Sequence, residues 1–277
     1  MKRFIIMLSF LAVVLLTVPE IAMSQTPKRS IGDHFSGEVL RYEVGFWLFD
    51  SIGVGVATFA RLEDGKYEVL HEGKAAEWIE WLISPRREIY RSVMATINGG
   101  KRLVPLLFEE YSIIGKWSRK KTTIYDYGAR KVRIEMQKEG RTEREEVDIP
   151  EGIIYDSPVT AFYNFRFGVY GAIEPGKVFL FRMVPTKGQN TFRMRVASKE
   201  ESEARRASEK QKNGKDIFMR IELDKEMLHS KKGELEIWFN RNLVPQSGVV
   251  KDVIFFGDIY GRLTGRDFSP TSAKPSL

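Results

Sequence analysis

The chain of 277 residues contains no cysteine. This absence excludes disulfide bonds, thiolate metal sites and a thiol nucleophile, and it excludes a lipid anchor on an N-terminal cysteine. A chain of this length buries enough apolar surface for a stable core without cross-links. The sequence therefore predicts a fold that depends on packing alone.

Histidine is scarce as well, with single residues at positions 34, 71 and 229. None lies in a recognisable catalytic or zinc-binding motif, and neither G-x-S-x-G nor H-E-x-x-H occurs. The acidic pairs Glu109-Glu110 and Glu145-Glu146 lie on segments expected to be extended, where neighbouring side chains point to opposite faces. We therefore expect no catalytic residues, no bound metal and no cofactor; a hydrolase or lyase is the minor alternative.

Long apolar runs are missing except at the N-terminus. Lys2 and Arg3 precede an uncharged run of fifteen residues, 4–18, and a small-residue cleavage pattern ends at Ser24. The run is short for a membrane span, which needs about 20 residues. We expect a signal peptide over 1–24 and hence export; an uncleaved N-terminal anchor is the alternative.

The charge balance is only moderately basic. The formal net charge is +7, and the first 24 residues contribute +1 through Lys2, Arg3 and Glu20, which leaves +6 on the rest. Such an excess favours association with anionic surfaces, for example lipid headgroups or acidic polysaccharide. Because the basic residues mostly alternate with acidic ones, we expect no nucleic-acid partner.

Beyond residue 36, apolar residues recur mainly with a period of two, and no Pro- or Gly-rich linker divides the chain. Leu40, Tyr42 and Val44, for example, share one face of a segment whose other face is charged, as in a half-buried strand. Strands are expected at 37–49, 54–62, 67–71, 88–97, 120–127, 129–137, 178–184, 190–198, 217–223, 234–240, 249–256 and 259–263.

These strands predict a mostly-β fold. We expect one highly curved antiparallel sheet, a half-barrel or open barrel of about a dozen strands, with two short helices packed on one face. The sheet is expected to form a single domain over 30–268. The tail, 269–277, is expected to be disordered.

Three segments depart from the strand period. The stretch 74–84 has apolar residues at helical spacing, and 157–167 begins with Ser157 as a helix N-cap followed by Pro158. These are the two expected helices. The run 199–216 has six basic and five acidic residues and is expected to be either a solvated helix or an exposed loop.

The stretch FWLFDSIGVGVATF, 46–59, places bulky residues just ahead of alternating Gly and Val. Gly53 and Gly55 share one face of the expected returning strand. We interpret this bare face as lying beneath the bulk of Trp47 and Phe49. The alternative is a ligand that approaches the glycine backbone.

Aromatic bulk is the feature that most favours a binding site. The expected helix 74–84 is apolar around more than half its circumference, and such a surplus must face core, ligand or partner. Buried core is the simpler interpretation. The candidate ligand-binding residues are Phe46, Trp47, Phe49, Trp78, Trp81, Phe162, Tyr163 and Arg166. Arg86, Arg87 and Arg166 are expected at a rim, where they would contact an anionic headgroup; ordinary solvated surface is the alternative.

Several motifs follow one another between about Phe35 and Leu263: FSGEVLRYEVGFWLFDSIGVGVATF, LVPLLFEEY, YDSPVTAFYNFR, IWFNRNLVPQSGVVKD and GDIYGRL. In this order they resemble the DUF3108 family of exported bacterial proteins of unknown function. The resemblance implies a β-rich fold and a location in the periplasm or cell envelope of a Gram-negative bacterium, and it offers no catalytic residues. The chain also looks like the LolA- and LolB-like carriers of lipids and lipoproteins, a likeness of fold that says little about function.

Our hypothesis from the sequence is a soluble envelope protein that binds an acyl chain or another amphiphile in an apolar concavity of the sheet. The alternative is a non-enzymatic interaction module that docks on an envelope protein, a polysaccharide or an anionic membrane surface. A cavity large enough for a chain favours the first, and a filled core with a flat aromatic patch favours the second.

Overall fold

The computed structural model describes residues 29–46, 49–80, 84–186, 189–209, 216–223, 225–254 and 256–269. The strands are β1 (Glu38–Phe46), β2 (Phe49–Arg61), β3 (Tyr67–Ala75), β4 (Arg86–Ile97), β5 (Arg102–Ile114), β6 (Trp117–Asp126), β7 (Lys131–Lys138), β8 (Arg141–Asp148), β9 (Val178–Thr186), β10 (Gln189–Val196), β11 (Ile217–Glu222), β12 (Glu234–Phe239), β13 (Pro245–Val253) and β14 (Gly257–Phe268). The helices are α1 (Ile31–Phe35), the 3-10 turn η1 (Glu77–Ile79), α3 (Pro158–Phe167), α4 (Lys199–Glu209) and α5 (Lys225–Leu228).

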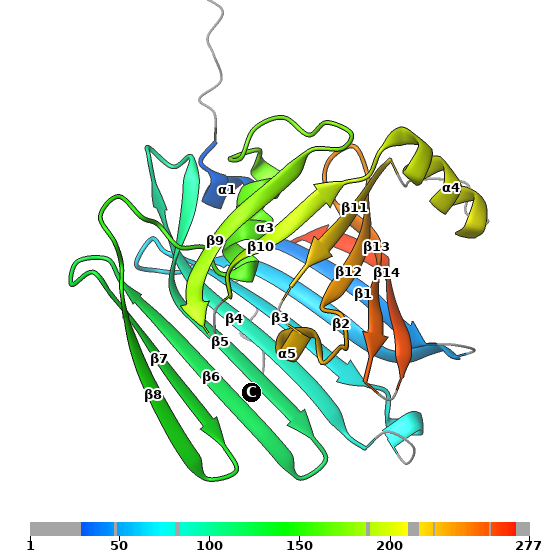
Figure 1. Cartoon of the computed structure of the whole chain (residues 1–277), viewed down its shortest axis with the longest axis horizontal. Coiled ribbons are helices and arrows are strands. Elements are labelled where there is room, and N and C mark those ends of the chain that lie inside the picture. The colour runs from blue at the N-terminus through cyan, green and yellow to red at the C-terminus, as the bar shows by residue number, and fades with distance from the viewer. Residues whose placement is uncertain are drawn as a thin grey trace, which may run out of the picture.

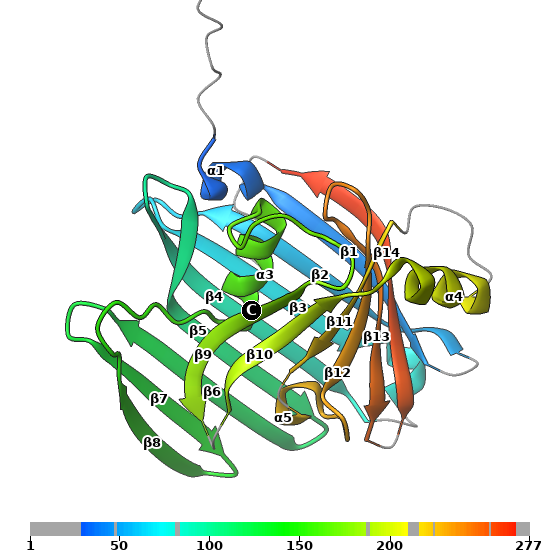
Figure 2. The same ribbon diagram turned by 45° about the horizontal axis from the view of Figure 1, so that its top comes forward.

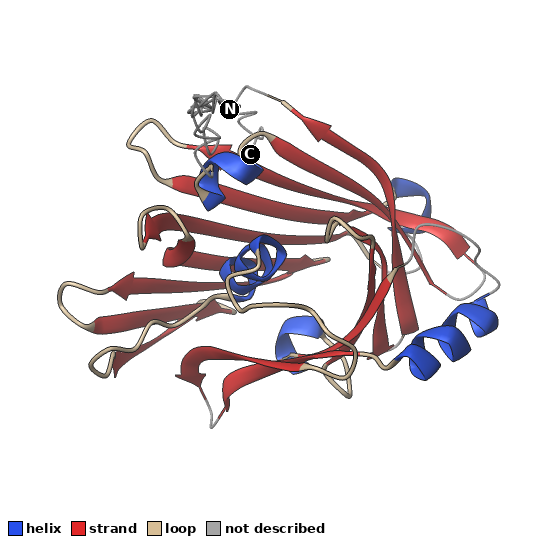
Figure 3. Ribbon diagram, turned by 90° about the horizontal axis from the view of Figure 1, so that it is seen from above, coloured by secondary structure: helices blue, strands red, loops and turns tan. Residues whose placement is uncertain are grey.

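All of these strands form one antiparallel sheet of 14 strands, in the order β8-β7-β6-β5-β4-β3-β2-β1-β14-β13-β12-β11-β10-β9. The sheet therefore consists of two meanders that are joined where β1 pairs with β14. Because twist accumulates between neighbouring strands, a sheet this wide curls, and Figures 1 and 3 show it nearly closed into a barrel. The prediction of one highly curved antiparallel sheet is confirmed.

The connection between the two edge strands, β8 and β9, contains α3. Ser157 caps this helix by accepting a hydrogen bond from the Thr160 N–H at 3.1 Å, and Pro158 occupies its first turn. At the other end Gly168 adopts a left-handed conformation, φ 85°, that closes the helix. The predicted helix is thus confirmed.

The sheet curves around α3, which lies inside it in Figure 2 and is buried over most of its surface. Two hydrophobic clusters meet the helix. One contains Phe59, Val69 and Met94 and comes mainly from the strands before α3. The other contains Phe181 and Phe239 and comes from the strands after it. Since both clusters pack on α3, the helix is the centre of the core.

The helix expected over 74–84 is wrong at its start, because β3 continues to Ala75 and pairs there with Gly53 of β2. It is followed by η1, whose Ile79 is buried while Trp78 is 53% exposed. The residues 81–83 lie outside the described part of the chain. Backbone pairing with β2 keeps this segment extended where its apolar spacing favours a helix.

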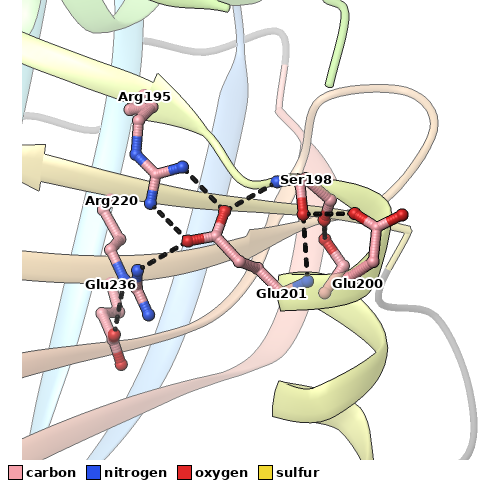
Figure 4. Close-up of polar contacts among 7 residues, drawn as sticks. Arg195, Ser198, Glu200, Glu201, Arg220 and Glu236 are labelled. Carbon is pink, nitrogen blue, oxygen red and sulfur yellow. Dashed lines mark hydrogen bonds and ion pairs between the residues drawn. The ribbon is translucent and has the colours of Figure 1, made fainter. Parts of the chain in front are cut away.

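Residues 199–209 of the charged run form α4 on the outside of the sheet (Figures 1 and 4), and 210–215 lie outside the described residues. Glu201 accepts hydrogen bonds from Arg195 at 2.7 Å, from Arg220 at 3.2 Å and from the Ser198 N–H at 2.8 Å. The Arg195 contact, followed by that of Ser198, lowers the pKa of Glu201 to about 2. The contacts of Glu201 with Arg195 and Arg220 attach α4 to the sheet, so we assign these charged residues a structural role.

Candidate functional site: an apolar cavity inside the sheet

Between α3 and the strands on its β10–β14 side the interior is open. A cavity of about 460 Å³ lies there, within the range of roughly 300–1,000 Å³ typical of ligand pockets. Its walls are almost entirely apolar. They are formed mainly by Tyr42, Val44, Tyr90, Val159, Phe162, Phe192, Met194, Ile221, Leu235, Ile237, Val250 and Ile259.

A second cavity of about 200 Å³ continues the first toward the end of the sheet. The two share the wall residues Val44, Leu228, Val250 and Ile259. The two cavities are therefore adjacent and together form an elongated apolar region, which suits an extended chain better than a compact ligand.

Glycines create much of this room. Gly55 and Gly261 face the main cavity, and a Cβ at either position would meet nothing closer than 3.6 Å. At position 53 glycine is needed for a different reason: a Cβ there would lie 2.5 Å from the Lys74 carbonyl oxygen of the neighbouring strand, which is too close. Phe49 packs instead on Phe46, with ring centroids 5.5 Å apart. For Gly55, therefore, the structure favours the alternative that we considered, a bare backbone beside a ligand space.

The candidate aromatic residues separate into two groups. Phe162 of α3 lies in the wall of the main cavity, whereas Tyr163 is fully buried and packs edge-on against Phe35 and Phe59, which makes it part of the core. The other group lies at the end of the sheet, where the rings of Phe49 and Trp78 are 6.0 Å apart.

Phe46 connects this second group to the protein interior. Its ring is buried and packs on Phe256, which lines the second cavity. The remaining two candidates, Trp47 and Trp81, lie outside the described residues. The structure therefore brings Phe46, Phe49 and Trp78 together beside one end of the apolar space, and Phe162 into its wall.

Arg166 does not lie at a rim, contrary to the sequence prediction. Its guanidinium and the carboxylate of Glu38 in β1 are both buried, and they form two hydrogen bonds of 2.6 and 2.7 Å. Arg166 also donates to the Leu243 carbonyl at 2.9 Å, and Arg266 donates to Glu38 at 3.0 Å. Burial alone would raise the pKa of Glu38, but the contacts with the two arginines hold it below its ordinary value. This ion pair joins α3 to β1 and keeps the Arg166 guanidinium in the interior, where it cannot reach a headgroup at the surface.

The two other arginines expected at a rim occupy opposite faces of β4, as neighbours in a strand must. Arg86 lines the second cavity and forms an ion pair with Glu88 at 3.3 Å. Arg87 is bonded to Glu72 of β3 at 2.7 Å. Arg86 alone of the three is therefore placed beside the apolar space.

The connection between β11 and β12, which contains α5, crosses to β4 and covers the interior. Met227 and Leu228 of α5 line the main cavity. The Tyr90 hydroxyl donates to the Met227 carbonyl at 3.3 Å, and His229 lies 3.5 Å from Glu88. Since β11 and β4 are far apart in the sheet, these contacts hold the connection across the opening as a cover.

His71 of β3 is a wall residue that the sequence did not single out. Its ring lines the main cavity beside Phe162, and its Nε2 is buried without a hydrogen-bond partner among the described residues. Burial, and to a lesser extent the charge of Arg166, lowers the pKa of His71 to about 4, so the imidazole is neutral at physiological pH. Its alternation with Tyr67 and Val69 was the available signal, since all three share the inward face of β3.

Within the described segments, no group of three or more His, Asp or Glu residues is arranged to hold a metal ion. In the same segments, no helix is both long enough and apolar enough to cross a membrane. The three histidines lie in different places, in α1, in β3 and directly after α5.

The fold and the cavity define a class of protein, one in which a single, nearly closed antiparallel sheet surrounds a helix and an apolar cavity. The sequence profile of DUF3108, described as a protein of unknown function, matches residues 41–264. The chain belongs to this family, as its motifs indicated. No curated protein and no solved structure matches the chain.

Proposed function

We propose that the protein binds a single-chain amphiphile in the cavity lined by α3, the sheet and the α5 connection, without catalysing a reaction. The observation that carries this proposal is the size and apolar lining of the 460 Å³ cavity. Because this cavity is partly open, its apolar walls face water when it is empty and lose the contacts that a packed core would give them. An acyl chain would offset that loss, because each buried methylene contributes about 0.8 kcal/mol.

The elongated arrangement of the two adjacent cavities and the cover formed by α5 support a carrier that encloses its ligand. The barrel-like fold is compatible with LolA-like lipid carriers. We further propose that the protein acts in the cell envelope after removal of residues 1–24. N-terminal sequencing of the protein from its native host should begin at Gln25; a chain that still begins at Met1 contradicts export by cleavage.

The test of the binding function is native mass spectrometry of the protein purified from its native host, with organic extraction of bound molecules. We expect an added mass that is lost on extraction and identified as a lipid or another amphiphile. Delipidated protein should regain the mass when titrated with fatty acid, fatty alcohol or monoacylglycerol. A folded protein that carries nothing and takes up none of these would overturn the proposal.

The alternative is an interaction module that docks through exposed apolar residues. The observation in its favour is the edge strand β9, where Val178 is 38% and Leu180 is 67% exposed. A Leu180→Lys variant separates the two functions. It should leave uptake of an amphiphile unchanged, whereas it should abolish capture of a protein partner that docks on this edge.

A further inference from the structure

We propose that the ligand of this cavity carries an uncharged hydrogen-bonding group, a hydroxyl or an ester carbonyl, and that His71 binds it. This inference rests on the proposed function, because it names the chemical class of the ligand in the same cavity. It assigns a specificity role to a residue that both the sequence motifs and the aromatic candidates left out.

The first step is the unsatisfied nitrogen. Among the described residues that line the main cavity, His71 has the one buried side-chain polar atom without a hydrogen-bond partner. Leaving a buried polar group unpaired costs about 1–3 kcal/mol, so native proteins rarely do so without a reason. Two other polar side chains of the wall are already in use: Tyr42 donates to the Pro245 carbonyl and Tyr90 to the Met227 carbonyl, each at 3.3 Å.

The second step concerns water. An ordered water in a cavity needs roughly two to four polar partners. His71 is instead paired with Ala57 and Tyr90 on the flanking strands, and the ring centroids of Phe162 and Tyr163 each lie 6.5 Å from its own. These mainly apolar neighbours give a water molecule few hydrogen-bond partners. A polar atom of the ligand therefore forms the hydrogen bond that the imidazole lacks.

The third step is charge. The guanidinium that acts on His71, that of Arg166, is compensated by Glu38, and Arg86 at the second cavity is compensated by Glu88. A neutral imidazole provides one N–H donor and one lone pair, which match a hydroxyl or a carbonyl. A carboxylate at His71 would be buried without a counter-charge, which is far more costly than burying a neutral group.

The test compares two ligands of equal size in delipidated protein, 1-decanol and undecane, by competition against a fluorescent apolar probe. In His71→Phe, which keeps a flat ring but has no polar atom, the affinity for decanol should fall about tenfold, while that for undecane stays within about twofold. His71→Gln should retain most of the preference of the wild-type protein. A Val44→Ala variant, at another wall position, should weaken both ligands by the same factor.

Imidazole ¹⁵N chemical shifts provide a second readout that needs no variant. The Nε2 or Nδ1 resonance of His71 should move on addition of decanol and stay in place with undecane. If both competitors bind but His71→Phe weakens them equally and neither moves the resonance, the assignment of His71 is wrong and amphiphile binding stands. If neither competitor binds, the proposed function itself fails. A larger loss for decanoate than for decanol in His71→Phe would show an anion site and overturn the neutral-group assignment.

Discussion

Glu38 and Arg166 form a buried ion pair in which each side chain neutralises the charge of the other. In Glu38→Gln the Arg166 guanidinium, whose side chain is 1% exposed, keeps its charge but loses its counter-ion. We expect the free energy of unfolding to fall by about 3–5 kcal/mol, as measured by urea denaturation at neutral pH.

The matched control for this substitution is Glu43→Gln in the same strand. Glu43 bonds to Arg262 at 2.7 Å on the solvent side, where an ion pair contributes little. A similar loss in both variants would contradict the structural role of the buried pair. Replacing both partners, as in Glu38→Leu with Arg166→Met, should restore much of the stability because no fully buried charge is left unmatched; Arg266, which also contacts Glu38, is 31% exposed and remains hydrated.

His71 should make stability depend on pH in the acidic range. The folded state lowers its pKa from an ordinary 6.5 to about 4, so between these values the unfolded chain binds a proton that the folded protein does not. Stability is therefore lost as the pH falls through this window. Relative to His71→Phe, the wild-type protein should lose about 2 kcal/mol between pH 8 and pH 5, as measured by denaturation at each pH. Parallel pH profiles for the two proteins would show that His71 is not buried in a neutral form.

Sequence patterns predicted the secondary structure around Arg166 and His71, but not the residues that they contact in the folded protein. Arg166 lies in the last turn of a correctly predicted helix, but its partner Glu38 is 128 positions away, which no local spacing shows. His71 alternates with Tyr67 and Val69 in the sequence, which indicates that the three share one face of a strand. What that face of the strand encloses depends on the closure of the sheet, so its role became visible only in the structure.

At the scale of elements, two helices of the protein begin with the same cap but differ in what they support. Ser157 of α3 and Ser198 of α4 each accept a backbone N–H bond of 3.1 Å. Ser157→Ala should lower the free energy of global unfolding by about 1 kcal/mol or more, because α3 is the centre of the core. Ser198→Ala should mainly increase hydrogen exchange within α4, which lies outside the sheet. Equal effects of the two substitutions on global unfolding, measured by urea denaturation, would contradict this distinction.

The strands that the sequence analysis left out have physical reasons for being missed. β5 contains Pro105, which pairs with Met94 at a register shift, and proline inside a run argues against a central strand. β8 is an edge strand in which most residues are exposed and charged, so it has no apolar period to detect. Both segments were nevertheless expected to be extended. The side chains of Glu109 and Glu110 do point to opposite faces: Glu109 contacts Arg91, whereas Glu110 points into the interior beside Lys121.

At the scale of the whole molecule, the cavity results from closure rather than from any one motif. The two meanders are joined by β1 and β14, and the chain between the edge strands carries α3 into the space that they enclose. This one helix fills only part of the interior of a 14-stranded sheet, and the remaining space forms the apolar cavity. A period-two pattern predicts inward faces for single strands, but the volume left between them depends on how all the strands curve.

A larger side chain that fills this cavity should therefore weaken ligand binding without lowering the stability of the fold. Gly261 of β14 lines the cavity, and a Cβ there would meet only the Glu43 carbonyl oxygen at 4.0 Å. Gly261→Leu should lower the affinity for an amphiphile at least about tenfold, because its side chain occupies the volume of several methylenes, each worth about 0.8 kcal/mol. Thermal stability should stay equal or rise, since the added side chain packs in an open space and replaces a glycine within a strand.

Gly265→Leu, in the same strand but outside the cavity wall, is the matched control, because a Cβ there would lie 3.9 Å from the Arg41 guanidinium. Titration of both delipidated variants with 1-decanol, alongside thermal denaturation, decides the outcome. A Gly261→Leu protein that melts like the wild type and still binds with full affinity would place the ligand elsewhere. The expected result, lost binding in one variant and full binding in the other, would assign the ligand to the interior of the sheet.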